Sequence, residues 1–97
     1  MVAHNFGAAY LGLGEHRRAA EWYRTAAELS AEIGDAAPRA EALNRLADVY
    51  DADGRLTEAA DACERALAIY DELGHPDAAK ARTKLAGLRR ETAHREP

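Results

Sequence analysis

The chain repeats itself with a period of 40 residues, so that residues 1–34 return in altered form as residues 41–74. Seven positions are identical in the two copies, and the paired tyrosines and glycines are the most telling of them. These pairs are Tyr10 with Tyr50, Gly14 with Gly54, and Gly34 with Gly74. A fixed period between 20 and 50 residues is typical of solenoids, whose units pack only on their neighbours. Such folds usually bind and seldom catalyse.

The composition favours helices over strands. Ala, Leu, Glu and Arg, all good helix formers, are abundant, whereas Val, Ile, Thr and Phe are scarce. A chain of 97 residues is too short for more than one domain. We therefore expect a single all-α domain over residues 1–97.

Apolar spacing and turn residues predict five antiparallel helices. The first ends at Gly14, the second at Gly34, the third near Ala52 and the fourth at Gly74; the fourth opens at Thr57 and the fifth at Pro76. Asp35 is expected to cap the third helix with its side chain, and Pro38 lies in the first turn, where its missing N–H is harmless. The inward face expected of the second helix consists of Ala19, Ala20, Tyr23, Ala26, Ala27 and Ser30.

The two units share an order of large, small and aromatic residues. In the second unit this order is Leu43, Leu46, Ala47, Tyr50, Gly54, Ala59, Cys63 and Ala66; in the first it is Phe6, Gly7, Tyr10, Gly14, Ala19, Tyr23 and Ala26. The pattern resembles the tetratricopeptide repeat (TPR) family, in the long form of about 40 residues seen in bacterial regulatory and signalling proteins. The resemblance implies an α-α superhelix with repeat one at 1–37, repeat two at 38–75, a terminal capping helix at 76–93 and a frayed tail at 94–97.

Small residues are expected where the two helices of a unit cross. Gly7 and Ala47 would let the second helix approach the first, and Ala19 and Ala59 would offer the matching small surface. A leucine at Ala47 or Ala59 is therefore expected to overpack the crossing by about 1–3 kcal/mol.

The resemblance implies a concave, peptide-binding side lined by the first helix of each unit. The third helix carries a polar stripe at helical spacing, formed by Glu41, Asn44, Asp48 and Asp51. The matching positions are His4, Ala8 and Leu11 on the first helix, and Thr83, Gly87 and Arg90 on the fifth. This mixed groove, acidic in its middle, favours a partner segment that contains Lys or Arg. The alternative is that the stripe is the polar face of any surface helix.

Charge is distributed unevenly, with a net charge of −8 over residues 1–79 and +4 over residues 80–97. An acidic body argues against nucleic-acid binding, which needs a basic surface. No apolar run approaches the length of a membrane span. Cys63 is the single cysteine, so no intrachain disulfide can form, and a reducing, cytoplasmic location fits best.

The sequence offers no arrangement for catalysis, and we expect no cofactor. The four histidines lack the spacing of metal ligands, so we expect no metal site. His16 is expected to pack, and Cys63 is expected to be a buried structural thiol. Trp22 is expected to pack on a flank, shared with Leu29 and Ile33, that meets the following repeat.

These observations predict a non-catalytic protein- or peptide-interaction scaffold, and the uncapped start predicts an excerpt of a larger regulatory or signalling protein. The last helix would present Lys80, Lys84, Arg89 and Arg90 as the polar outer face that a terminal repeat needs. The alternative is a self-association element, in which an edge formed by Val2, Phe6 and Leu13 pairs with its twin in a homodimer.

Overall fold

The computed structural model describes residues 2–95, except for the side chains of Val2 and His4. Over this range it contains five α-helices and no strand, which confirms the all-α prediction. The helices are α1 (Val2–Gly12), α2 (His16–Glu32), α3 (Ala36–Ala52), α4 (Leu56–Leu73) and α5 (Ala78–Arg95).

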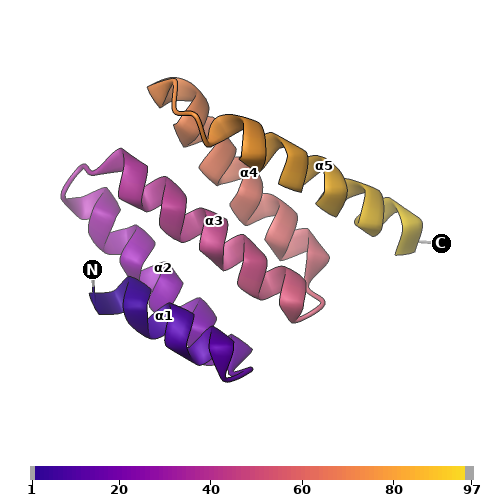
Figure 1. Cartoon of the computed structure of the whole chain (residues 1–97), viewed down its shortest axis with the longest axis horizontal. Coiled ribbons are helices and arrows are strands. Elements are labelled where there is room, and N and C mark those ends of the chain that lie inside the picture. Colours follow the sequence, from indigo (N-terminus) through magenta and orange to yellow (C-terminus); the bar gives the residue numbers. More distant parts are fainter. Residues whose placement is uncertain (1, 96–97) are drawn as a thin grey trace.

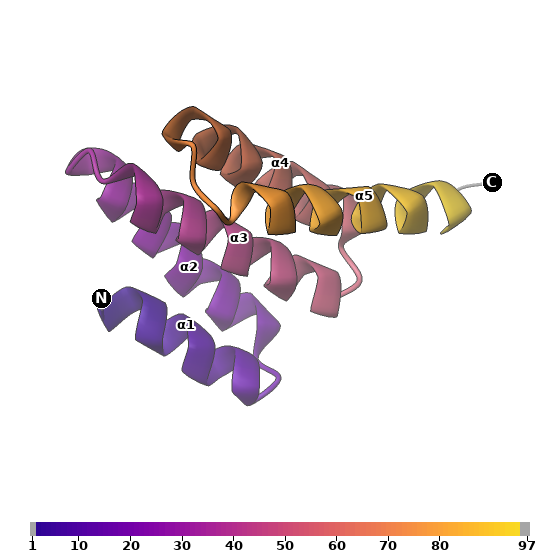
Figure 2. The ribbon, with the colours of Figure 1, turned by 45° about the horizontal axis from the view of Figure 1, so that its top comes forward.

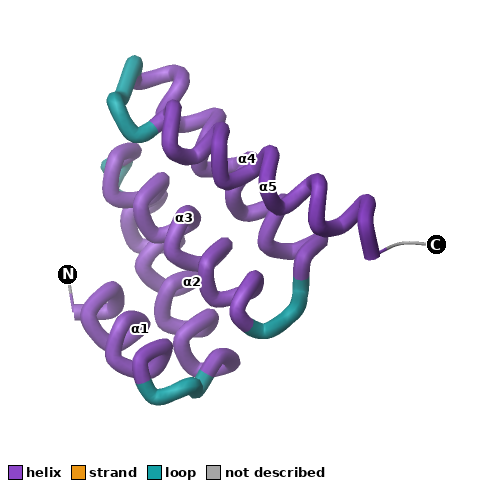
Figure 3. Tube along the Cα trace, turned by 45° about the vertical axis from the view of Figure 1, so that its right-hand side comes forward, coloured by secondary structure: helices purple, strands orange, loops and turns teal. Residues whose placement is uncertain are grey.

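The helices form a two-layered slab of about 42 × 33 × 18 Å. Each helix packs on its neighbours in sequence, from α1 on α2 through to α4 on α5. As a result α1, α3 and α5 lie in one layer, with α2 and α4 behind them (Figures 1, 2 and 3). We call these the A layer and the B layer. The N-terminal and C-terminal ends lie at opposite ends of the array (Figure 1).

Four glycines at 20-residue intervals end the first four helices. Gly14, Gly34, Gly54 and Gly74 all have φ between 61° and 76°, which costs little only for glycine. In each turn the N–H of the residue after the glycine donates to a carbonyl five residues back. These bonds are Glu15 to Tyr10, Asp35 to Ser30, Arg55 to Tyr50 and His75 to Tyr70. The paired glycines that mark the repeat are therefore helix stops, as predicted.

The helix starts differ from the sequence-based prediction by one or two residues. Asp35 occupies the N-cap position of α3, but its side chain makes no capping hydrogen bond there. The fourth helix begins at Leu56 rather than Thr57, and the fifth at Ala78 rather than Pro76. A separate turn precedes α5, because the N–H of Asp77 donates to His75 Nδ1 at 3.0 Å. At the other end α5 continues to Arg95, beyond the predicted limit of residue 93.

The core is built mainly from alanines and a few large side chains. All six residues predicted for the inward face of α2 are buried, and so are Leu43, Leu46 and Ala47 on α3. The structure also buries Val49 and Ala42, which the sequence reading left out. An added Cβ at Gly7 would lie 2.9 Å from the Tyr23 ring, which confirms the close crossing predicted for the first unit.

The structure adds detail to three predicted packing roles. Trp22 packs against the core, as predicted, and its ring lies against that of Phe6 of α1, with centroids 4.8 Å apart and the planes tilted by 32°. On the same flank Ile33 is 71% exposed. His16 makes a polar contact, with Nδ1 3.3 Å from Asp53 Oδ1, because it begins α2 beside the turn between α3 and α4.

Candidate interaction surfaces

The residues predicted for the groove lie on the three A-layer helices. Ala8, Glu41, Asp51, Thr83 and Arg90 are exposed, and Leu11, Asn44, Asp48 and Gly87 are half-buried. The side chain of His4 lies outside the described part of the chain. None of the described residues predicted for the groove is fully buried, although Leu11 packs against the core from its half-buried position.

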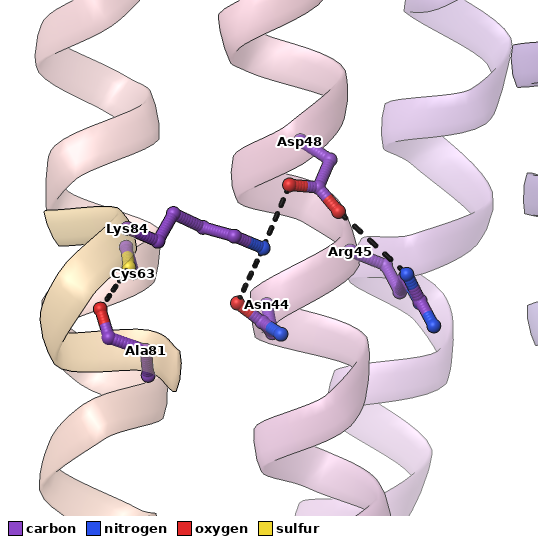
Figure 4. A network of polar contacts seen from close by, with 6 residues as sticks. All are labelled: Asn44, Arg45, Asp48, Cys63, Ala81 and Lys84. Atoms are coloured by element: carbon purple, nitrogen blue, oxygen red, sulfur yellow. Dashed lines mark hydrogen bonds and ion pairs between the residues drawn. The ribbon is translucent and has the colours of Figure 1, made fainter. Parts of the chain in front are cut away.

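A polar network crosses the A layer at the centre of this surface (Figure 4). Lys84 extends from α5 to α3, where its Nζ lies 2.7 Å from Asp48 Oδ1 and donates to Asn44 Oδ1 at 2.8 Å. The other carboxylate oxygen of Asp48 lies 3.8 Å from a guanidinium nitrogen of Arg45. Lys84 therefore joins α5 to α3 and does not belong to the outer face of α5, contrary to the sequence reading.

This network changes the electrostatics of the polar stripe. Asp48 faces two cations, so much of its negative charge is balanced within the chain. Glu41 and Asp51 are the exposed carboxylates of the stripe on either side of it. The sequence did contain a signal for the missed contact, because Asn44 and Lys84 are separated by 40 residues, the period of the repeat.

Two further ion pairs join α5 to α4. Arg82 lies 2.8 Å from Asp71, and Arg89 lies 3.0 Å from Glu64. Both pairs are exposed, so each is worth at most about 1 kcal/mol. Together with Lys84 they explain why a basic last helix follows an acidic body: its cations lie against acidic side chains of α3 and α4.

Cys63 lies at the centre of the contact between α4 and α5. The thiol is buried and donates to the carbonyl oxygen of Ala81 at 3.4 Å. Burial raises the pKa of the Cys63 thiol, which keeps it protonated and unreactive near neutral pH. The prediction of a buried structural thiol is confirmed.

The B layer contains a cavity of about 520 Å³ that sequence reasoning missed. It lies between α2 and α4, and α3 forms its floor. Its apolar walls are formed by Ala27 and Ala31 of α2, Leu43 and Leu46 of α3, and Ala62 of α4. Charged side chains surround it, and no residue of the predicted groove lines it. The described chain thus presents two separate surfaces, one on each layer.

In the described residues, no group of three His, Cys, Asp or Glu side chains is placed to hold a metal ion. In the same part of the chain, no helix is both long and apolar enough to cross a membrane.

Comparison with known families accounts for the architecture. The profile described as tetratricopeptide repeat matches residues 1–72 and again residues 38–96. The two matches overlap across α3 and α4 and together span almost the whole chain. The chain therefore belongs to the tetratricopeptide repeat family. No curated protein matches it.

Proposed function

We propose that the chain is a non-catalytic scaffold that binds a protein or peptide segment across the A layer. The family to which it belongs mediates protein–protein interaction. The observation that supports the A layer is that Glu41, Asp51, Thr83 and Arg90 are exposed there without being needed for the core. The unit boundaries at residues 37 and 75, a capping role for α5 and a cytoplasmic location are parts of the same proposal.

The partner segment carries a Lys or Arg that pairs with Asp51. Asp48 is less suited to this role, because Lys84 and Arg45 already balance its charge. Asp51 is exposed near the end of α3, where a long cationic side chain can reach it without disturbing the network. Charge pairing of this kind gives orientation and speed of association more than affinity.

The test is a titration of the ¹⁵N-labelled chain with an amidated lysine-containing peptide and with its glutamate counterpart. The lysine peptide should shift the amide signals of Ala8, Asn44, Asp51 and Thr83, and the glutamate peptide should not. Asp51→Lys should weaken binding several-fold and reduce its salt dependence. Glu21→Lys, with the same change of charge on an exposed residue of α2, is the control. Equal binding of both peptides, or shifts confined to α2 and α4, would refute the proposal.

A second candidate function is homodimerisation through the edge formed by α1 and α2. There the Phe6 and Trp22 rings lie 4.8 Å apart, Leu29 and Ile33 follow Trp22 along α2, and Phe6 and Leu29 are each 44% exposed. Leu13, predicted to help form this edge, is 75% exposed in the turn after α1. The side chain of Val2 is outside the described part of the chain. An apolar edge of this kind is typical of a contact surface.

Sedimentation at several concentrations tests this candidate. A dimer should dissociate when Ile33→Lys places a charge on the edge, and should persist with Leu73→Lys, an exposed leucine near the end of α4. A monomer at all concentrations, or equal effects of both substitutions, would exclude dimerisation through this edge.

A further inference from the structure

The cavity of the B layer lies where the second unit lacks an aromatic side chain that the first unit has. The 40-residue period pairs Phe6 with Leu46 and Trp22 with Ala62. In the first unit the two rings are in contact, with centroids 4.8 Å apart and the planes tilted by 32°. In the second unit both counterparts are small enough to leave space, and both line the cavity. The cavity therefore occupies the side of Ala62 on which the first unit places an indole.

One end of the cavity carries cations. Arg39 and Arg65 line this end. Arg39 lies near the start of α3, just after the turn between α2 and α3. Arg65 lies on α4, which runs antiparallel to α3 and so returns toward that turn. Among the described residues neither arginine has an ion-pair partner. Glu28 of α2 is the acid that lines the same end. Two guanidinium groups against one carboxylate leave this end with a net positive charge.

The opposite end is closer to neutral. Glu58 lies near the start of α4 and lines the cavity together with Arg24 of α2, and Asp61 lies between Glu58 and Arg65, about one helical turn from Arg65. Glu58 is already paired, because its carboxylate accepts a hydrogen bond from Arg55 at 2.7 Å. Three arginines and three carboxylates line the cavity, but Glu58 is paired with Arg55, so Arg24, Arg39 and Arg65 exceed Glu28 and Asp61 by one positive charge.

We propose that this cavity is a second docking site, which takes an aromatic side chain from a partner segment that also carries an acidic residue. The aromatic ring fills the space beside Ala62 and Leu46, and the carboxylate pairs with Arg65 and Arg39. Arginine is suited to this role, because its planar guanidinium can bind both oxygens of a carboxylate. Aromatic anchors in pockets that are dry at the centre and polar at the rim carry most of the binding energy in many interfaces.

The spacing on α4 defines the shape of the segment. Ala62 and Arg65 are three residues apart on one helix, which is about one turn, or roughly 5 Å along its axis. A helical partner whose aromatic and acidic residues lie one turn apart can reach both at once. This site differs from the A-layer proposal in the helices it uses and in the charge of the partner, so the two can be tested independently.

The probe is an acetylated and amidated alanine-based peptide of about 13 residues, with glutamine for solubility and with Trp and Glu placed one helical turn apart. Titrated into the ¹⁵N-labelled chain, it should shift the amide signals of Ala31, Leu43 and Ala62 and leave those of Asp51 and Thr83 unchanged. Replacing its Trp by Ala should abolish binding. Replacing its Glu by Lys should weaken binding about ten-fold.

Variants of the chain complete the test. Arg65→Glu should weaken binding of the Glu peptide about ten-fold and restore binding of the Lys peptide. Arg17→Glu, with the same charge change at an exposed position of α2 that lines neither surface, should leave both unchanged. Ala62→Trp should fill the cavity from within and abolish binding, while circular dichroism shows an unchanged helix content. If Ala62→Trp does not fold, the charge reversal Arg65→Glu, at an exposed position, remains the test of the proposed site. No shift with the Glu peptide at millimolar concentration, shifts on the A layer with that peptide, or equal binding of the Glu and Lys peptides at the cavity would overturn the proposal.

Discussion

The backbone at Gly7 lies against the ring of Tyr23, so close that an added Cβ would be 2.9 Å from two of its carbons. Tyr23 is buried and has no room to move away. At the equivalent crossing of the second unit the residue pair is different, since Ala47 replaces Gly7 and Cys63 replaces Tyr23. Both of these are fully buried. A larger residue on one helix is thus matched by a smaller one on its partner.

Gly7→Ala is expected to destabilise the chain. Overpacking against the Tyr23 ring costs about 1–3 kcal/mol, and the better helix propensity of alanine recovers up to about 1 kcal/mol of it. The control is Gly87→Ala, because an added Cβ at Gly87 meets nothing within 4 Å. That variant should melt at a higher temperature than the parent chain, and Gly7→Ala at a lower one. A Gly7→Ala melt at or above that of the Gly87 variant would contradict the close contact.

The double variant Gly7→Ala with Tyr23→Cys tests the matching directly. It reproduces the residue pair that the second unit already carries, so alanine at position 7 should no longer clash. In a double-mutant cycle, the cost of Gly7→Ala should fall by at least about 1 kcal/mol when Tyr23 is absent. Additive costs would show that the ring and the added methyl group do not interact.

Lys84→Met should loosen α5 without unfolding the rest of the chain. The methionine keeps most of the apolar stem but loses the contacts to Asp48 and Asn44, which are 2.7 and 2.8 Å long. The expected loss is about 1 kcal/mol for a half-buried charged group. Hydrogen exchange of α5 amides should accelerate more than that of α2 amides. Lys80→Met, at an exposed position of the same helix, should have no such effect.

Ser30→Ala should stabilise the chain slightly. The hydroxyl oxygen of Ser30 is buried and has no hydrogen-bond partner among the described residues. Removing an unsatisfied buried hydroxyl is expected to gain up to about 1 kcal/mol, since no hydrogen bond is lost. The control is Thr25→Ala, because the Thr25 hydroxyl is exposed and donates a hydrogen bond to the Glu21 carbonyl. A lower melting temperature for Ser30→Ala would reveal a partner for this hydroxyl, such as an ordered water.

Stability should fall above about pH 8.5 because of Cys63. Burial raises the pKa of its thiol in the folded chain, although nearby Lys84 lowers that pKa to a smaller extent. The unfolded thiol ionises near pH 8.5. The stabilisation is therefore complete below that pH and is lost as pH rises toward the folded pKa. Urea unfolding between pH 7.5 and about 9.5 should show a steeper loss for the parent chain than for Cys63→Ala. Parallel slopes would contradict the raised pKa.

Helix number, helix ends and buried faces could be predicted from the sequence because they depend on local chemistry. Apolar spacing predicts which face of α2 is buried, and a glycine with positive φ ends a helix wherever it falls. The 40-residue repeat also predicted the family and the close crossing at Gly7, since equivalent residues in a solenoid meet equivalent neighbours. Helix starts were less accurate, because Asp77 and His75 form a turn that residue type alone does not reveal.

The residues predicted for the groove could be placed on one layer from the repeat, but their ion-pair partners could not. Whether Asp48 is available depends on Lys84, and a lysine side chain is long enough to point to solvent or to a neighbouring helix with almost equal cost. That choice is made only when α5 packs beside α3. The cavity beside Ala62 likewise depends on how closely α2 and α4 approach above α3, which is a property of the packed array.

The sequence by itself therefore determined that this chain is an all-α array of tetratricopeptide repeats, because period, helix propensity and turn glycines act within a few residues of one another. Only the tertiary structure decided which charges balance each other and where space remains. Those outcomes depend on distances of a few ångströms between helices that are some 20 to 40 residues apart in the chain, as between Asn44 and Lys84.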